Sequence, residues 1–172
     1  MERRLSSDTR FGGDFLQVRV DEVENEGGHR STREVVTTRG AAAIVCVHGA
    51  DLVLVRQYRY PVGRSLLEIP AGLVDEGETP EQAAARELVE EVGLSPRSLE
   101  HLTSYFAAPG FANHAVDLFF TDDVEETDTD PDDGEVLEIV RRPLATIRDL
   151  ITKGEVSDAK TLIGLALVAL RG

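Results

Sequence analysis

The sequence predicts an α+β fold, in which a mixed, curved β-sheet lies between α-helices and a small antiparallel β region precedes it. Segments with alternating apolar and polar residues recur along the chain, and this alternation is typical of β-strands. Helical periodicity is confined to a few segments, the clearest of which is Pro80–Val92. With 172 residues, the chain is long enough for one domain with a buried core.

The N-terminal part of the chain is predicted to form a small β region. Apolar and polar residues alternate across residues 15–36, and the pair Gly27 and Gly28 interrupts the alternation as a turn. We therefore place an N-terminal β region at residues 1–38 and the main domain at residues 39–172.

Two apolar, branched runs open the main domain and predict a hairpin with a buried face. They are Ala41–Val47 and Leu52–Tyr60, joined by the turn His48–Asp51. Further strands are expected at Ser65–Leu73, Leu99–Ala108, His114–Val124 and Glu135–Pro143. The segment Pro143–Gly154 begins with proline and ends with glycine, as helices often do, and Thr161–Leu170 is apolar enough for a packed terminal helix.

The charge balance excludes some classes of partner. The chain has 32 acidic and 18 basic residues and a formal net charge of −14, whereas surfaces that bind nucleic acid or anionic membranes need basic patches. Met1–Arg10 lacks the apolar core of a signal peptide, and no apolar run is long enough to cross a bilayer. We therefore expect a cytoplasmic protein without nucleic-acid or membrane partners, in which Cys46 is a reduced core residue and the acidic stretch 121–134 is a solvated loop.

The clearest helix has signals at both of its ends. Thr79 can cap the first turn, Pro80 suits the first helical position, and Gln82 completes a capping box with Thr79. Gly93 suits the position after the last turn, where a left-handed conformation is common. The spacing predicts a helix over Pro80–Val92 with an apolar stripe facing the sheet. That stripe consists of Ala84, Leu88 and Val92.

Three glutamates lie close together on this helix. Glu87, Glu90 and Glu91 are at positions i, i+3 and i+4, where carboxylates repel one another by roughly a few tenths of a kcal/mol per pair. Convergent carboxylates are also the ligands that hard cations such as Mg²⁺ prefer, and a bound cation would remove the repulsion. The alternative is a solvated acidic face, in which an arginine such as Arg86, four residues before Glu90, pairs with the glutamates.

A longer motif surrounds these glutamates. Gly72 is followed after five residues by Glu78, and after a further seven by the segment Arg86–Leu94, which has the sequence RELVEEVGL. These nine fixed positions, with their gaps, resemble the Nudix box, the signature of a family that cleaves nucleoside diphosphates linked to another group. The resemblance implies the Nudix fold, a divalent-metal-dependent pyrophosphatase activity, and a cation site at the crowded glutamates.

The resemblance also implies which groups hold the metal. Glu87 and Glu91 would be the main ligands, with Glu90 assisting in binding and catalysis and the backbone carbonyl of Ala71 completing the shell of one cation. Arg86 would contribute to catalysis as the arginine of the motif. About two or three Mg²⁺ or Mn²⁺ ions per site are expected in such an enzyme.

Residues outside the motif narrow the resemblance to the ADP-ribose pyrophosphatase subgroup. Pro109 lies sixteen positions after Gly93, as a proline does in that subgroup. Residues 31–36, 57–81 and 154–167 also resemble its corresponding segments. The resemblance implies hydrolysis of ADP-ribose, or of a related nucleoside diphosphate sugar, to AMP and ribose 5-phosphate.

The same resemblance implies a set of substrate contacts. Arg59 would contact the diphosphate or the terminal ribose, and Glu68 would help to hold the substrate. In the subgroup, the N-terminal β region is exchanged across a homodimer and supplies groups that stack on adenine. Phe11 is the best aromatic candidate, whereas Phe15 starts an alternating strand and is better explained as core; Arg33 would stack on adenine or pair with phosphate. The predicted set is completed by Leu73, Pro109, Gly110 and His114.

Two residues are candidates for the base that takes a proton from the attacking water. Several members of the family place a glutamate five residues after the proline, where this chain has His114. Other members have an asparagine just before that position, as with Asn113 here, and take a glutamate from a later loop in a DGE context. Glu135 matches that context and is the predicted base, with His114 in reserve.

Two other functions stay open. The preferred substrate could be a different nucleoside diphosphate sugar, such as GDP-mannose, because the motif specifies the chemistry and not the group attached to the diphosphate. A Nudix fold can also sense ADP-ribose or a nucleotide without cleaving it. The complete motif favours an enzyme over such a sensor.

Overall fold

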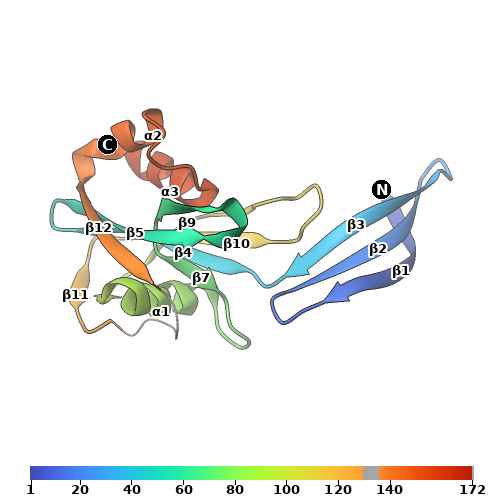
Figure 1. Ribbon diagram of the computed structural model, residues 1–172, viewed down its shortest axis with the longest axis horizontal. Helices are drawn as coiled ribbons and strands as arrows, with labels where there is room; N and C mark the ends of the chain where they lie inside the picture. Colours follow the sequence, from blue (N-terminus) through green and yellow to red (C-terminus); the bar gives the residue numbers. More distant parts are fainter. Residues whose placement is uncertain (130–135, 172) are drawn as a thin grey trace. The chain divides into compact units, whose positions relative to one another are not determined.

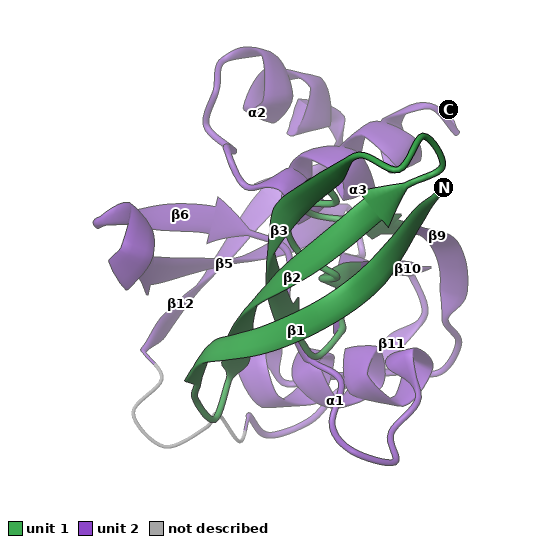
Figure 2. Cartoon of the chain, turned by 90° about the vertical axis from the view of Figure 1, so that its right-hand side faces the viewer, with its two compact units in different colours: residues 1–40, 105–115 green, residues 41–104, 116–172 purple. Residues whose placement is uncertain are grey.

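The computed structural model describes residues 1–129 and 136–171 (Figure 1). These residues form two compact units (Figure 2). The first unit consists of residues 1–40 and 105–115, and the second contains the other described residues. The first unit thus combines the N-terminal β region with a segment that lies between two strands of the main domain.

The first unit contains a three-stranded antiparallel sheet. Its strands, which lie in chain order, are β1 (Glu2–Gly12), β2 (Leu16–Asn25) and β3 (Arg30–Thr38). The sequence does not predict β1, because its residues are mostly polar; its pairing with β2 is supported by contacts such as the 2.9 Å ion pair between Arg3 and Glu24. The backbone N–H of Val36 donates to the oxygen of Phe111 at 2.7 Å, which ties segment 105–115 to the sheet.

The second unit is built on a mixed sheet. Its strands are β4 (Ala41–His48), β5 (Asp51–Arg59), β6 (Arg64–Glu68), β7 (Ala71–Leu73), β9 (Glu100–Phe106), β10 (Ala115–Thr121) and β12 (Leu137–Pro143). They lie in the order β12-β5-β4-β10-β9, with β6 beside β5 and β7 beside β4. Strand β10 runs parallel to β4, whereas β5 and β7 run antiparallel to it. Two short strands, β8 (Leu94–Pro96) and β11 (Val124–Glu126), form a separate ladder.

Helices lie on both faces of this sheet, as predicted. Helix α1 (Pro80–Val92) lies on one face, and α2 (Ile147–Thr152) and α3 (Ala159–Ala169) lie on the other (Figure 1). Short 3₁₀ turns at Tyr60–Val62 and Leu144–Thr146 follow β5 and β12. Within the described part of the chain, no helix has the length and apolar character needed to cross a membrane.

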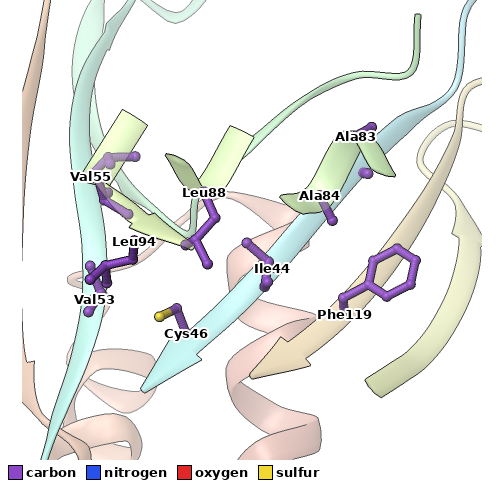
Figure 3. Close-up of a cluster of buried hydrophobic side chains, with 11 residues drawn as sticks. Ile44, Cys46, Val53, Val55, Ala83, Ala84, Leu88, Leu94 and Phe119 are labelled. Carbon is purple, nitrogen blue, oxygen red and sulfur yellow. The ribbon is translucent and has the colours of Figure 1, made fainter. Parts of the chain in front are cut away.

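Strand β4 lies at the centre of the core and is buried on both faces. Ile44 and Cys46 belong to the apolar cluster beneath α1, together with Leu88 (Figure 3). On the other face, Gly164 of α3 lies so close that a Cβ atom there would be 2.7 Å from Cγ2 of Val45. Strands buried on both faces have continuous apolar sequences, as this one does. Cys46 is a free, buried cysteine, as expected of a reduced core residue, and burial raises the pKa of its thiol to about 12.

Helix α1 begins and ends where the sequence predicts. The Thr79 hydroxyl accepts a hydrogen bond from the N–H of Gln82 at 3.2 Å, and the Gln82 side chain accepts one from the N–H of Thr79 at 2.9 Å. Gly93 follows the last turn at φ 66°, in the left-handed region. The predicted apolar stripe is buried at Ala84, Leu88 and Val92.

The helix predicted over Pro143–Gly154 begins later than expected. Pro143 ends β12 opposite Asp51 of β5, because proline lacks the N–H that a ladder hydrogen bond needs. A 3₁₀ turn at Leu144–Thr146 follows, and α2 starts only at Ile147. The proline therefore marks the end of a strand rather than the first turn of the α-helix.

Candidate active site

One arginine organises the glutamates of α1. The Arg86 guanidinium donates to Glu78 through Nε and Nη2, at 3.0 and 3.1 Å. Its Nη1 donates to both Glu87 and Glu90, each at 2.8 Å. Nη2 also donates to the backbone oxygen of Leu73 in β7, at 3.0 Å. The pairing of Arg86 with Glu90 that the spacing suggested is present, and the same guanidinium joins α1 to β7.

Several carboxylates surround the single positive charge of Arg86. Three of them share the Arg86 guanidinium, whose pKa is raised above its ordinary value mainly by the hydrogen bonds to Glu78. The pKa of Glu78 is lowered, chiefly by the same bonds. Glu91 adds a fourth carboxylate to this group; it is buried, and its Oε2 accepts a hydrogen bond from the N–H of Ala71 at 3.1 Å. A further cation entering here would therefore meet several anionic oxygens.

Gly72 of β7 lies directly against the carboxylate of Glu87. A Cβ atom at position 72 would be 1.8 Å from Oε1 and 2.2 Å from Cδ of Glu87. Only glycine leaves room for this carboxylate beside the strand. The glycine of the motif thus has a steric role, because it lets the Glu87 carboxylate lie against the backbone of β7. The neighbouring Ala71 N–H binds Glu91.

The donor set fits a hard divalent cation. Glu87, Glu90 and Glu91 supply carboxylate oxygens, the ligand type that Mg²⁺ and Mn²⁺ take, and the space beside Gly72 admits one of these carboxylates to β7. Across residues 1–129 and 136–171, no group of three or more His, Cys, Asp or Glu side chains is placed to hold a metal ion. Nη1 of Arg86 contacts both Glu87 and Glu90 at 2.8 Å, so the guanidinium holds these two carboxylates. A cation that binds here would share these carboxylates with the Arg86 guanidinium or replace it as their partner.

A second charged cluster contains Arg59, the last residue of β5, and Glu68, the last residue of β6. Glu68, which is 1% exposed, accepts hydrogen bonds from Nε and Nη2 of Arg59 at 2.8 and 2.7 Å. Lys160 of α3 also donates to Glu68, and it donates to Asp158 at 3.0 Å. Burial would raise the pKa of Glu68, but the hydrogen bonds from Arg59 and the charge of Lys160 together lower it. Of the two predicted substrate residues here, only Arg59 is exposed enough to reach a ligand.

Arg59 lies in the electrostatic field of Glu91, one of the α1 glutamates. Its pKa is raised mainly by the hydrogen bonds to Glu68, and the charge of Glu91 contributes as well. Glu91, predicted to bind metal, and Arg59, predicted to bind the diphosphate, lie in one region of the second unit, since Glu91 binds the N–H of Ala71 and Arg59 binds Glu68, three residues earlier. Leu73, another predicted substrate residue, contributes its backbone oxygen to Arg86 in the same region.

Three aromatic or basic residues of interest lie in the N-terminal part of the first unit. Phe11 is exposed, as an adenine-stacking residue would have to be. Phe15 is also exposed, at 55%, so the expectation that it belongs to the core is wrong; it precedes the first residue of β2 and lies outside the ladder. Arg33 of β3 pairs with Glu2 of β1, through Nε at 3.1 Å and through Nη2.

The other predicted substrate residues of the first unit lie in segment 105–115. Pro109 and Gly110 form part of a turn. Gly110 is open to solvent, since a Cβ atom there would meet nothing within 4 Å. Nδ1 of His114 is 3.1 Å from the backbone oxygen of Arg39, so the imidazole is held by the main chain. Glu135, the predicted base, lies outside the described residues.

Sequence reasoning missed Lys160 and Asp158. One signal was available: the chain has 18 basic residues, and Lys160 is one of only two lysines among them. It also lies in the first turn of α3, where the helix dipole disfavours a cation. A lysine in that place indicates a specific anionic partner, but the sequence does not say that the partner is Glu68.

Known proteins share both the motif and the fold of this chain. Residues 37–163 match the NUDIX domain family. The chain belongs to the Nudix family. The ADP-ribose pyrophosphatase of Bacillus subtilis (strain 168) is 33% identical over 173 residues, which cover 99% of this chain and 94% of that protein. The methanol dehydrogenase activator of Bacillus methanolicus is 32% identical, with the same coverage of 99% and 94%. A crystal structure of an ADP compounds hydrolase has a TM-score of 0.90 and 29% identity, and the match covers 99% of this chain and 93% of that chain.

Membership of the Nudix family confirms two predictions. The α+β fold, with a mixed sheet between helices, is that of the ADP compounds hydrolase. The motif Gly72–Leu94 lies inside the matched range, and a relative that spans nearly the whole chain is named ADP-ribose pyrophosphatase, the predicted subgroup. The Nudix match begins at residue 37, so most of the N-terminal β region lies outside it.

Proposed function

We propose that this Nudix hydrolase cleaves the diphosphate of ADP-ribose, or of a closely related nucleoside diphosphate sugar, to give AMP and ribose 5-phosphate. The observation that carries the proposal is the row of carboxylates on α1 with Arg59 close by, since Glu91 binds the N–H of Ala71, three residues after the Glu68 that binds Arg59. Such a combination suits a diphosphate that is accompanied by a divalent cation. The likeness to the Bacillus subtilis ADP-ribose pyrophosphatase across 99% of this chain supports the choice of substrate.

The glutamates of α1 are the proposed cation ligands. Glu87 and Glu91 would be the main ligands, Glu90 a further one, and the Ala71 carbonyl would complete the shell of one ion. Glu91 is already fixed by the Ala71 N–H, which limits the reorganisation that binding requires. We propose Mg²⁺ or Mn²⁺, with about two or three ions per site. Such cations neutralise phosphate charge and make water more acidic when bound.

Other side chains would bind the diphosphate and receive the proton. Nε and Nη2 of Arg59 donate to Glu68, which leaves Nη1 to donate to a phosphate oxygen. Glu135 is the proposed base that takes a proton from the attacking water, with His114 in reserve. The water oxygen bonds to one phosphorus, proposed to be the adenosyl one, as the bond from that phosphorus to the bridging oxygen breaks. Leu73, Pro109 and Gly110 are proposed as further substrate contacts.

The decisive test is a substrate panel. With Mg²⁺ present, we expect ADP-ribose to be converted to AMP and ribose 5-phosphate in equal amounts, and excess EDTA to abolish the reaction. GDP-mannose and NADH serve as competing substrates, and products are separated by anion-exchange chromatography. Faster cleavage of GDP-mannose than of ADP-ribose would show that the preferred substrate is another nucleoside diphosphate sugar. Binding of ADP-ribose without cleavage of any compound would indicate a sensor and contradict an enzyme.

We also propose a homodimer in which residues 1–38 are exchanged. Within β1, β2 and β3 only Asp21 and Val23 are buried, whereas a three-stranded sheet needs a covered apolar face for stability. A partner chain would cover this sheet, and it would bring Phe11 and Arg33 to the adenine of the partner's site. Light scattering after gel filtration should give about twice the 18.8 kDa of one chain. A single-chain mass at micromolar concentration would contradict the exchange.

A further inference from the structure

The buried carboxylate of Glu68 links three segments of the second unit. Arg59 ends β5, Glu68 ends β6, and Lys160 lies in the first turn of α3. Glu68 is 1% exposed and receives hydrogen bonds from both cations. A buried carboxylate is costly unless it is fully paired, so the two cations hold it in one position.

Lys160 is itself held by the start of α3. Asp158 caps this helix: its Oδ2 accepts hydrogen bonds from the N–H and the hydroxyl of Thr161, at 3.0 and 2.7 Å. The same oxygen accepts one from Lys160 at 3.0 Å. The Thr161 hydroxyl also accepts a hydrogen bond from the N–H of Ile69, at 2.9 Å, which fixes α3 to the residue that follows Glu68. Lys160 thus occupies a rigid place, at 14% side-chain exposure.

Arg59 is the exposed end of this chain of contacts. Its side chain is 37% exposed, whereas that of Glu68 is 1% exposed. Glu68 binds its Nε and Nη2 in a planar, two-point contact, which fixes the orientation of the whole guanidinium. Because Lys160 shares the charge of Glu68, the carboxylate does not fully neutralise Arg59, which keeps positive charge for an anion.

We propose that Lys160, held by Asp158, is a positioning residue that acts through Glu68 to orient the guanidinium of Arg59 toward the diphosphate. This inference rests on the proposed function. It assigns no substrate contact to Lys160 or to Glu68, whose carboxylate is buried. Lys160 matters for binding because a bidentate arginine contact with phosphate depends on the direction of the guanidinium plane.

Replacing Lys160 by methionine tests the proposal. Lys160→Met keeps most of the side-chain volume and leaves Glu68 paired with Arg59. We expect KM for ADP-ribose to rise about tenfold while kcat changes less than about threefold, because a charged hydrogen bond is weakened and the reacting groups are untouched. Lys160→Arg should restore most of the affinity. Lys153→Met is the matched control, since Lys153 is exposed and pairs with Asp149 on the surface, at 2.9 Å.

A double variant separates positioning from general stability. If Lys160 acts through Arg59, adding Lys160→Met to Arg59→Ala should change KM less than about twofold. An equal tenfold rise in both backgrounds would overturn the proposal, as would an unchanged KM in Lys160→Met alone. If Lys160→Met does not fold, Asp158→Asn removes the anion beside Lys160 but keeps the helix cap, and it should raise KM about threefold.

A binding measurement distinguishes this inference from the proposed function. Calorimetry with ADP-ribose in EDTA reports affinity without turnover, and Lys160→Met should raise Kd about tenfold. A wild-type protein that binds ADP-ribose but does not cleave it contradicts the proposed function, while the Lys160→Met shift in Kd would still support the positioning role. A wild-type protein that cleaves ADP-ribose, with an unchanged Kd in Lys160→Met, contradicts only the positioning role.

Discussion

The Glu91→Gln variant is expected to lose nearly all hydrolysis of ADP-ribose, by about a hundredfold to a thousandfold, and to stay folded. Glu91 is 5% exposed, and its Oε2 accepts a hydrogen bond from the N–H of Ala71 at 3.1 Å. The side-chain oxygen of glutamine can accept the same hydrogen bond, so packing between α1 and β7 should be kept. The negative charge that a divalent cation needs is removed.

Turnover with saturating Mg²⁺ and thermal unfolding should be measured on the same preparation of Glu91→Gln. Glu81→Gln is the matched control, because Glu81 is an exposed residue in the first turn of the same helix. It should keep wild-type turnover. If Glu91→Gln retains more than half of the wild-type turnover, Glu91 is not a metal ligand. A fall in turnover that is matched by unfolding at the assay temperature would show a structural role instead.

The ends of α1 could be predicted from sequence because their signals are local. Thr79, Gln82 and Gly93 act through hydrogen bonds and backbone conformations within one helical turn, so neighbouring residues contain all the information. The motif fixes the family for a similar reason. Its glutamates are spaced along one helix, and Gly72 lies on the strand that this helix packs against.

The partners of the charged side chains could not be predicted, because they come from distant parts of the sequence. Lys160 and Glu68 are 92 residues apart, and no residue near Lys160 identifies its partner. The partners of Arg86 could also be predicted only in part, although they lie closer in the sequence. The helical spacing suggested a pair with Glu90, whereas the guanidinium also binds Glu78, which precedes the helix.

In the N-terminal sheet, the alternation of apolar and polar residues does not identify every strand. Alternating apolar and polar residues identify a strand that is buried on one face. Strand β1 has no buried residue, so its sequence contains no such pattern, and the strand depends on its pairing with β2. The same alternation in β2 suggested that Phe15 begins a buried face, yet the strand starts one residue later and Phe15 is exposed.

Replacing Gly72 by alanine is expected to lower turnover about a hundredfold with little change in stability. Gly72 is absent from the residues with positive φ, so alanine suits its backbone conformation. The added Cβ would be 1.8 Å from Oε1 of Glu87, and this carboxylate would have to move. The end of a glutamate side chain can move at a low cost in free energy. We therefore expect the pairing of β7 with β4 to be kept. The lost function would therefore come from a displaced carboxylate and not from unfolding.

A double variant with Glu87 tests this cause. If Gly72→Ala acts only by displacing Glu87, then adding it to Glu87→Gln should lower turnover by less than about threefold, because residues that act as one unit are not additive. Gly27→Ala is the matched control, since a Cβ atom there would be in ordinary contact, 3.4 Å from Oδ1 of Asn25. Wild-type turnover in Gly72→Ala would show that Glu87 functions away from β7, and the glutamates would then need a different arrangement for catalysis.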